Sequence, residues 1–273
     1  MAQPAQPRAL IVTVYGLYAR ERGGWLPVSG LVRLLAGLGV DEPAVRSAIS
    51  RLKHRGLLVA ARRDGAAGYA LSPTAVEILD EGDLRIFTPP SATLADGWLL
   101  ATFSVPEAER SRRHTLRSTL SGLGFGTVAP GVWIAPAHRA DLTRSALRRR
   151  GLDPYVHLFR ADYLAYGDVQ SLAERWWDLP AVGRYYAEFV AGWAPVLDGW
   201  GRDPGSAARA YRDWVLALTA WRRLPYLDPV LPGELLPADW PGKAAVDVFQ
   251  ALAERLAEPA ARYVADVLGD ERE

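Results

Sequence analysis

The stretch DEPAVRSAISRLKHRGLLVAARRDGAAGYALS, residues 41–72, decides the fold of the N-terminal third of the chain. Asp41 suits the N-cap of a helix, Pro43 fits its first turn, and Gly56 suits the position after its last turn. We therefore expect a helix from Asp41 to Gly56. The segments LLVAARR and YALS flank the turn-rich tip DGAAG, which predicts a β-hairpin directly after the helix.

The predicted helix has an apolar and a polar side at a period of 3.6 residues. Val45, Ile49 and Leu52 form a stripe that we expect to pack against two preceding helices. Arginine can hydrogen-bond guanine with two N–H groups, and basic residues on a hairpin can reach phosphates or the minor groove. The polar side of the helix and the hairpin supply our candidate DNA-binding residues, which are Arg46, Ser47, Ser50, Arg51, Lys53, His54, Arg62 and Arg63.

Helices predicted at about residues 9–20, 28–38 and 73–87 complete this part of the chain. Residues 8–87 are therefore expected to form a winged helix-turn-helix DNA-binding domain, whose second helix enters the major groove while its back stays in the core. Two other interpretations of the basic face stay open. Such a face is also typical of a solvated amphipathic helix, and some winged helices serve only to bind proteins.

Beyond a predicted linker at residues 88–97, the predicted elements follow the order β-α-β-β-α-β. This order indicates a ferredoxin-like central domain over residues 96–167, which we expect to mediate dimerisation. Residues 168–270 are predicted to form a helical C-terminal domain. A non-helical segment, LPYLDPVLPGELLPADWPG at residues 224–242, interrupts it, and its five prolines make it rigid and extended. The predicted fold class is α+β.

The charge of the chain is small in total but uneven along its length. The formal net charge is +1, from 32 Lys and Arg against 31 Asp and Glu. Residues 1–90 carry 11 basic and 8 acidic side chains, whereas residues 179–273 carry 10 and 14. The N-terminal part is therefore the part that we expect to approach a phosphate backbone.

The composition also narrows the possible chemistry. The chain has no cysteine, which excludes disulfides, thiolate catalysis and cysteine-ligated metals. Its only N-terminal apolar run, residues 9–18, is too short to span a bilayer. We therefore expect a cytoplasmic protein with no membrane partner.

The sequence gives little support for catalysis. The central pattern is similar to that of small ferredoxin-fold endonucleases associated with CRISPR systems, but Ser104 stands where their metal-binding aspartate is expected. The glycines of GLGFG, residues 122–126, follow a predicted helix and fit a helix stop better than a phosphate loop. We assign no catalytic residue, no metal site and no cofactor. None of the four histidines stands at metal-ligand spacing from another, and these are His54, His114, His138 and His157.

Several segments together resemble a known family. VSGLVRLLAGLGV followed by VRSAISRLKHRGLL, and then GWLLATFSVPEAER and GFGTVAPGVWIAP, are similar to the PaaX family of phenylacetic acid degradation repressors. The most specific element is WRRLPYLDPVLPGELLPADWPG, residues 221–242, which resembles the C-terminal signature of that family. The resemblance extends along almost the whole chain. It implies a homodimeric, GntR-like winged-helix repressor of double-stranded operator DNA, released by an acyl-CoA thioester such as phenylacetyl-CoA.

Residues for such an effector are sought where aromatic and basic side chains gather. Seven of the ten tryptophans lie between Trp176 and Trp240, so an aromatic pocket beside cations for the coenzyme A phosphates is one interpretation. The other is that these tryptophans fill the core of a helical domain. Our candidate effector-binding residues are Trp221, Arg222, Arg223, Tyr226, Trp240 and Lys243. A metal-dependent nucleic-acid-processing enzyme and a non-catalytic interaction scaffold remain the alternative functions.

Overall fold

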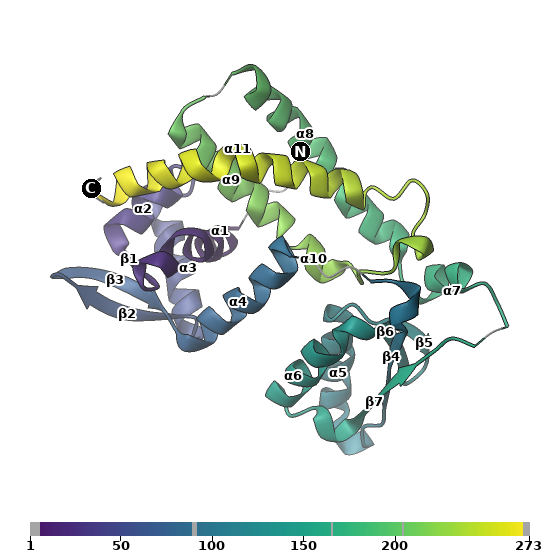
Figure 1. The fold of residues 1–273 in the computed structure, drawn as a ribbon. Coiled ribbons are helices and arrows are strands. Elements are labelled where there is room, and N and C mark those ends of the chain that lie inside the picture. Colours follow the sequence, from purple (N-terminus) through teal and green to yellow (C-terminus); the bar gives the residue numbers. More distant parts are fainter. Residues whose placement is uncertain (1–5, 89–91, 165, 204, 270–273) are drawn as a thin grey trace. The chain divides into compact units, whose positions relative to one another are not determined.

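The computed structural model describes residues 6–88, 92–164, 166–203 and 205–269 (Figure 1). Part of the predicted linker, residues 89–91, and the predicted end of the C-terminal domain, residue 270, lie outside the described residues. The chain forms two compact units, each built from segments that are distant in sequence. The N-terminal unit comprises Met1–Leu84, Ala187–Arg222 and Gly242–Glu273, and the central unit comprises Arg85–Tyr186 and Arg223–Pro241.

The N-terminal unit begins with three helices, a three-stranded sheet and a fourth helix. These elements are α1 (Pro7–Val14), the turns η1 (Tyr15–Ala19) and η2 (Arg20–Arg22), β1 (Trp25–Pro27), α2 (Val28–Ala36), α3 (Glu42–His54), β2 (Leu58–Arg63), β3 (Ala66–Leu71) and α4 (Pro73–Phe87). The sheet is antiparallel in the order β1-β3-β2. This is the element order of a winged helix-turn-helix. Strand β1 was not predicted, because its three residues form a strand only through their pairing with β3.

Helix α3 and the hairpin after it form where the opening stretch predicts them. The Asp41 carboxylate accepts a hydrogen bond of 2.7 Å from the amide of Ala44, which caps the helix. The apolar side of α3 is buried. The hairpin tip is shorter than predicted, since only Asp64 and Gly65 separate β2 from β3. Both residues have positive φ, as an Asp-Gly two-residue turn requires.

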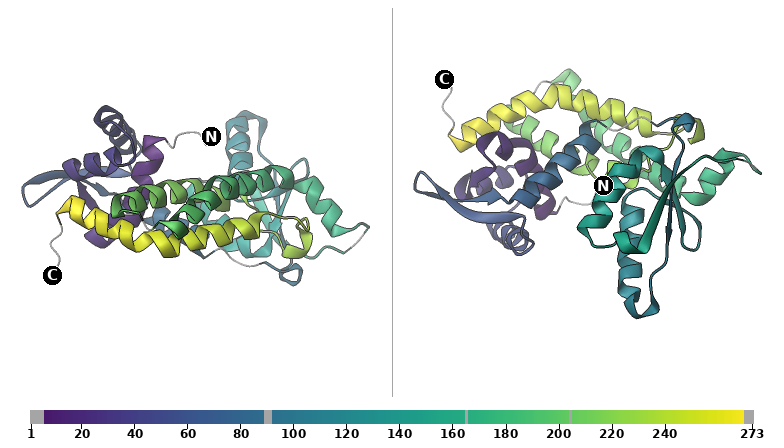
Figure 2. Two further views of the ribbon diagram at one scale, coloured as in Figure 1. Left: turned by 90° about the horizontal axis from the view of Figure 1, so that it is seen from above. Right: turned by 60° about the horizontal axis from the view of Figure 1, so that its bottom comes forward.

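Helices from the C-terminal part of the sequence complete the core of the N-terminal unit. They are α8 (Leu179–Arg202), from Ala187 onward, α9 (Ala207–Trp221) and α11 (Gly242–Leu268). Helices α9 and α11 lie side by side in every view (Figure 1 and Figure 2). The hydroxyl of the buried Tyr211 donates to the Leu34 carbonyl of α2 at 3.0 Å, and the hydroxyls of Thr13 and Thr219 lie 2.8 Å apart. Helices α1 and α2 therefore share one core with α9 and α11.

The central unit contains the predicted β-α-β-β-α-β order. Its elements are η3 (Leu94–Asp96), β4 (Trp98–Phe103), η4 (Glu107–Glu109), α5 (Arg110–Gly122), β5 (Gly126–Ala129), β6 (Val132–Pro136), η5 (Ala137–Arg139), α6 (Ala140–Arg149), η6 (Asp153–Tyr155), β7 (Val156–Ala161), α7 (Val169–Trp176), α10 (Leu224–Leu227) and η7 (Gly233–Leu235). The four strands form an antiparallel sheet in the order β5-β6-β4-β7. This strand order is that of a ferredoxin-like fold, and the α+β class is confirmed.

Both faces of the central sheet are covered. Leu99 and Trp133 belong to the core that packs against α5 and α6. Because side chains alternate along a strand, the neighbouring Trp98 and Ile134 face the other way, into a second core with α7 and the proline-rich segment. Trp98 stacks on Trp177 with ring centroids 6.1 Å apart.

The two units interleave, whereas the sequence suggested the consecutive domains 8–87, 96–167 and 168–270. The physical reason is the proline-rich segment, residues 224–241, whose apolar side chains pack on the central sheet while the helices on either side of it pack on the N-terminal unit. The segment is also less extended than predicted. It begins with the short helix α10, which tolerates Pro225 because a proline in the first turn breaks no helical hydrogen bond.

Candidate DNA-binding surface and effector residues

The polar side of α3 is fully presented to solvent. Every candidate DNA-binding residue of α3 and the hairpin is exposed, and these are Arg46, Ser47, Ser50, Arg51, Lys53, His54, Arg62 and Arg63. The opposite side of α3 is buried against α1 and the sheet, with Val45, Ala48, Ile49 and Leu52 at most 3% exposed. A helix with this division can enter a groove without disturbing its own core.

Local contacts orient the arginines of α3. The Arg46 guanidinium donates through Nε to Glu42 Oε1 at 2.7 Å, one turn earlier on the helix. The Arg51 guanidinium donates to the Ser47 hydroxyl at 2.9 Å. Exposed pairs of this kind contribute at most about 1 kcal/mol, so a phosphate or a base can replace the partner at low cost.

The two hairpin arginines differ in their contacts. Arg62 makes one long hydrogen bond, 3.4 Å, to the carbonyl of Gly65 in the turn. Arg63 donates to the carbonyls of Arg22 and Gly23 at 2.9 and 2.8 Å, and its guanidinium lies 5.5 Å from the ring centroid of Trp25. Arg63 therefore joins the hairpin to the end of the first helical region, and Arg62 is the hairpin arginine with a guanidinium available for a ligand.

The candidate effector residues are divided between the two units. Trp221 belongs to the N-terminal unit, is 2% exposed, and stacks on Phe249 of α11 with centroids 4.5 Å apart. Arg222 donates to the carbonyl of Ala9 in α1 at 3.1 Å. Lys243 is exposed on α11. The contacts of Trp221 and Arg222 favour a role in packing.

The other three candidates lie in the central unit. Arg223 is exposed, just before α10. The guanidinium of Arg85 lies 4.7 Å from the ring centroid of Tyr226. Trp240 meets Tyr186 edge to face, with centroids 5.9 Å apart. The proline-rich segment thus carries one exposed aromatic ring, Tyr226, and one half-buried ring, Trp240.

Asp228 organises the proline-rich segment, a role that we did not predict. Its carboxylate accepts hydrogen bonds of 2.6 Å from the hydroxyl of the buried Tyr186 and of 2.6 Å from the amide of Val230. Its carbonyl accepts from the Arg139 guanidinium at 3.1 Å. Burial, with the Asp228 charge next, raises the pKa of Tyr186. The pKa of Arg139 is lowered to about 10, first by burial and second by the positive charge of Arg85.

The glycines of GLGFG allow close approach of other backbone. Gly124 has a φ of +85°, and a Cβ there would lie 3.1 Å from the Cα of Pro229. Its carbonyl accepts from the indole N–H of Trp177 at 2.9 Å. A Cβ on Gly126 would lie 2.7 Å from the carbonyl of Trp176. These glycines therefore serve packing in addition to the predicted helix stop and strand entry.

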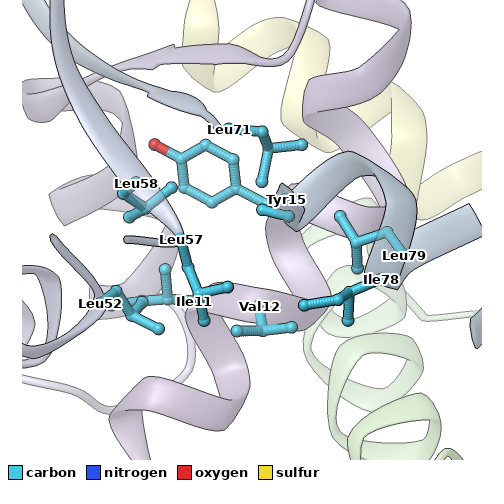
Figure 3. A pocket seen from close by; sticks show the side chains of 10 residues that line it. Ile11, Val12, Tyr15, Leu52, Leu57, Leu58, Leu71, Ile78 and Leu79 are labelled. Atoms are coloured by element: carbon cyan, nitrogen blue, oxygen red, sulfur yellow. The ribbon is translucent and has the colours of Figure 1, made fainter. Parts of the chain in front are cut away.

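The N-terminal unit encloses a small apolar cavity of about 40 Å³ (Figure 3). Aliphatic side chains from α1, α3, α4 and the hairpin strands line it, together with the Tyr15 ring, whose hydroxyl donates to the Tyr69 carbonyl at 2.9 Å. This volume is far below the few hundred Å³ of a typical ligand pocket.

Possible metal ligands were sought as clusters of side chains in the described ranges. No cluster of three or more His, Asp or Glu residues is found there. At Ser104, where the related endonucleases would have a metal-binding carboxylate, the backbone amide donates to the Tyr155 carbonyl at 3.1 Å. The helices of the described residues also include none that is long and apolar enough to cross a membrane.

Comparison with known proteins adds to these observations. Residues 6–75 match the model of the PaaX-like protein, residues 91–173 that of the PaaX protein central Cas2-like domain, and residues 177–266 that of the PaaX-like protein C-terminal domain. The chain is 27% identical over 270 residues to the transcriptional repressor PaaX of Escherichia coli (strain K12), covering 97% of this chain and 85% of the relative.

A solved structure supports the fold. The uncharacterized protein Rv0674 from Mycobacterium tuberculosis matches with a TM-score of 0.57 at 23% identity, covering 91% of this chain and 99% of that one. Models for the three parts of one family match in order along nearly the whole chain, so this chain belongs to the PaaX family.

Proposed function

We propose that this PaaX-family transcriptional regulator is a repressor that binds double-stranded operator DNA through α3 and the β2–β3 hairpin. We further propose that an acyl-CoA thioester, such as phenylacetyl-CoA, releases it. The observation that carries the DNA-binding proposal is the exposed basic side of α3 on a buried apolar back, followed directly by a hairpin with an available arginine. Because operator DNA is the target, we place the protein in the cytoplasm.

The geometry suggests how the contacts divide. Arg46 and Arg51 stand on the side of α3 that would face the floor of the major groove, where arginine reads guanine. Lys53, whose ammonium lies 5.6 Å from the ring centroid of Tyr69, and Arg62 stand closer to the hairpin and would neutralise phosphates. A homodimer would place two such helices on two half-sites, which is how helix-turn-helix proteins usually gain affinity.

The effector part of the proposal concerns the central unit. The proline-rich segment, which carries the family signature, offers the exposed ring of Tyr226 and the half-buried ring of Trp240. A thioester can shift the regulator away from DNA only if it binds the released conformation more tightly than the DNA-bound one. Trp221 and Arg222 are less suited to the effector, because their contacts belong to the core of the N-terminal unit.

Fluorescence anisotropy with labelled promoter DNA from directly upstream of the gene tests the proposal. We expect Arg51→Ala to weaken binding by about 1–3 kcal/mol, the usual contribution of a base-reading arginine. Arg62→Ala should weaken binding and reduce the salt dependence by about one released ion. Arg262→Ala is the matched control, since Arg262 is exposed on α11 and pairs with Glu258.

The expected titration shows salt-sensitive DNA binding that phenylacetyl-CoA reverses and free coenzyme A does not. If Arg51→Ala binds the promoter as tightly as the control variant, α3 does not read DNA in the way proposed. If binding is tight but no thioester reverses it, the effector part of the proposal fails and the DNA-binding part stands.

A further inference from the structure

A basic cleft on helix α5 of the central unit has no role in the function proposed above. It has a volume of about 430 Å³, within the range of about 300–1,000 Å³ that is typical of small-molecule sites. Its lining combines guanidinium, imidazole, hydroxyl and indole groups, from Arg110, Arg113, His114, Arg117, Ser118, Ser121 and Trp133. All but Trp133 belong to α5.

The spacing of the basic residues lines them up along one side of the helix. Arg110, His114 and Arg117 follow one another at intervals of four and three residues, so each lies about one turn after the last. Arg113 extends the same side and is the one that has partners, since it donates to the Val105 carbonyl at 2.8 Å and pairs with Glu107 at 3.1 Å.

Two arginines of the cleft are available for a ligand. Arg110 and Arg117 make no side-chain hydrogen bond and no ion pair with any described residue. By contrast, Arg112 on another side of α5 pairs with Glu109 at 2.8 Å and lies over the Tyr155 ring. Arg144 on α6 pairs with Asp141. Two unpaired guanidiniums therefore lie at the cleft, on the same side of α5.

Acidic residues are absent from the part of the sequence that lines the cleft. From Arg110 to Ala140 the chain has five arginines and two histidines but not one aspartate or glutamate. Like charges at one-turn spacing repel and destabilise a helix, so an anion that neutralises them gains affinity from the relief. Trp133 lies at the cleft, is 7% exposed, and its indole N–H makes no hydrogen bond with a described residue, although buried tryptophans usually find a partner.

We propose that the α5 cleft binds the phosphate groups of a nucleotide-bearing small molecule. Arg110 and Arg117 would take the phosphates, and the Ser118 and Ser121 hydroxyls would add hydrogen bonds. The identification of this ligand as the coenzyme A end of the thioester rests on the function proposed above. Phosphates of a DNA backbone have the same chemistry, so binding assays with the nucleotide and with operator DNA must distinguish the two ligands.

Isothermal titration of the full chain with adenosine 3′,5′-bisphosphate, the nucleotide end of coenzyme A, tests the proposal. We expect binding that adenosine alone does not show. The double variant Arg110→Ala with Arg117→Ala should weaken it at least tenfold, since even one hydrogen bond to a charged group is worth about a factor of ten in Kd. Arg112→Ala is the matched control and should stay within about twofold of the wild type. All the substituted side chains are exposed, so circular dichroism should show folded variants.

The same variants separate this proposal from its alternatives. Nucleotide affinity that is equal in wild type and double variant, or absent in wild type, overturns it. Loss of operator binding in the double variant, without nucleotide binding to the wild type, assigns the cleft to the DNA backbone and also overturns it. If phenylacetyl-CoA still releases DNA while the bisphosphate never binds, the cleft proposal fails alone. If the bisphosphate binds through Arg110 and Arg117 but no thioester releases DNA, the proposed effector fails alone.

Discussion

Asp228 is the position at which a single substitution should most affect the central unit. Its carboxylate accepts the hydroxyl of Tyr186, which is 5% exposed, and the amide of Val230. A hydrogen bond to a charged group contributes about 1.5–3 kcal/mol, and a buried donor left without a partner costs about 1–3 kcal/mol. We expect Tyr186→Phe to cost about 1.5–3 kcal/mol of unfolding free energy. Asp228→Ala should cost about 3–5 kcal/mol, because it loses two hydrogen bonds and leaves the hydroxyl unpaired.

The double variant distinguishes this reasoning from simple loss of packing. When Tyr186→Phe is combined with Asp228→Ala, no hydroxyl is left unpaired, so the combined cost should fall below the sum by about 1–3 kcal/mol. Urea denaturation followed by tryptophan fluorescence measures the three variants, with Asp239→Ala as an exposed control in the same segment. Additive costs, or an Asp228→Ala variant no less stable than Tyr186→Phe, would refute the role of Asp228.

Three further outcomes follow from individual contacts. Gly124→Ala should lower the free energy of unfolding by about 2–3 kcal/mol, because the positive φ of Gly124 and the nearby backbone of Pro229 both oppose a Cβ. At Gly122 a Cβ would meet no atom within 4 Å, so Gly122→Ala should be neutral or stabilising. Thermal unfolding of the two variants measures the difference. The pKa of His138 is lowered from an ordinary value of 6.5 to about 4, mainly by burial and secondly by the adjacent Arg139 guanidinium. The neutral form of His138 is therefore favoured in the folded state. The wild type should therefore lose stability as the pH falls from 6.5 towards 4. Between pH 7 and pH 5, the midpoint of urea denaturation should fall less for His138→Gln than for the wild type. Arg63→Ala should lower stability by about 1 kcal/mol through its two carbonyl contacts, whereas Arg62→Ala should change DNA affinity at constant stability.

The features that the sequence predicts well are local ones. The N-cap Asp41 and the apolar stripe of α3 follow from residue spacing alone, and so does the exposure of the basic side. The order of elements in the central unit also follows, because strands and helices there alternate with clear turn residues. Strand β1 was missed because three residues carry no periodicity of their own.

The features that the sequence does not predict depend on long-range packing. To predict the two interleaved units, one would need to know that the proline-rich segment packs on the central sheet while α9 and α11 pack on α1 and α2. For the same reason, Arg63 looks like a phosphate ligand in the sequence, yet its guanidinium binds carbonyls 40 and 41 residues earlier in the chain. Trp221 similarly suits a pocket by composition, yet it stacks within a core.

The interleaved units also restrict how an effector could act on DNA. If the thioester binds the central unit as proposed, its effect must reach α3, which belongs to the other unit. The chain passes between the units four times, and two of these passages lie inside helices, α4 and α8. The passages beside α10 and before α11 lie between elements. Coupling needs a physical element whose state both ligands change, and α4, which follows directly on the hairpin, meets that requirement most simply.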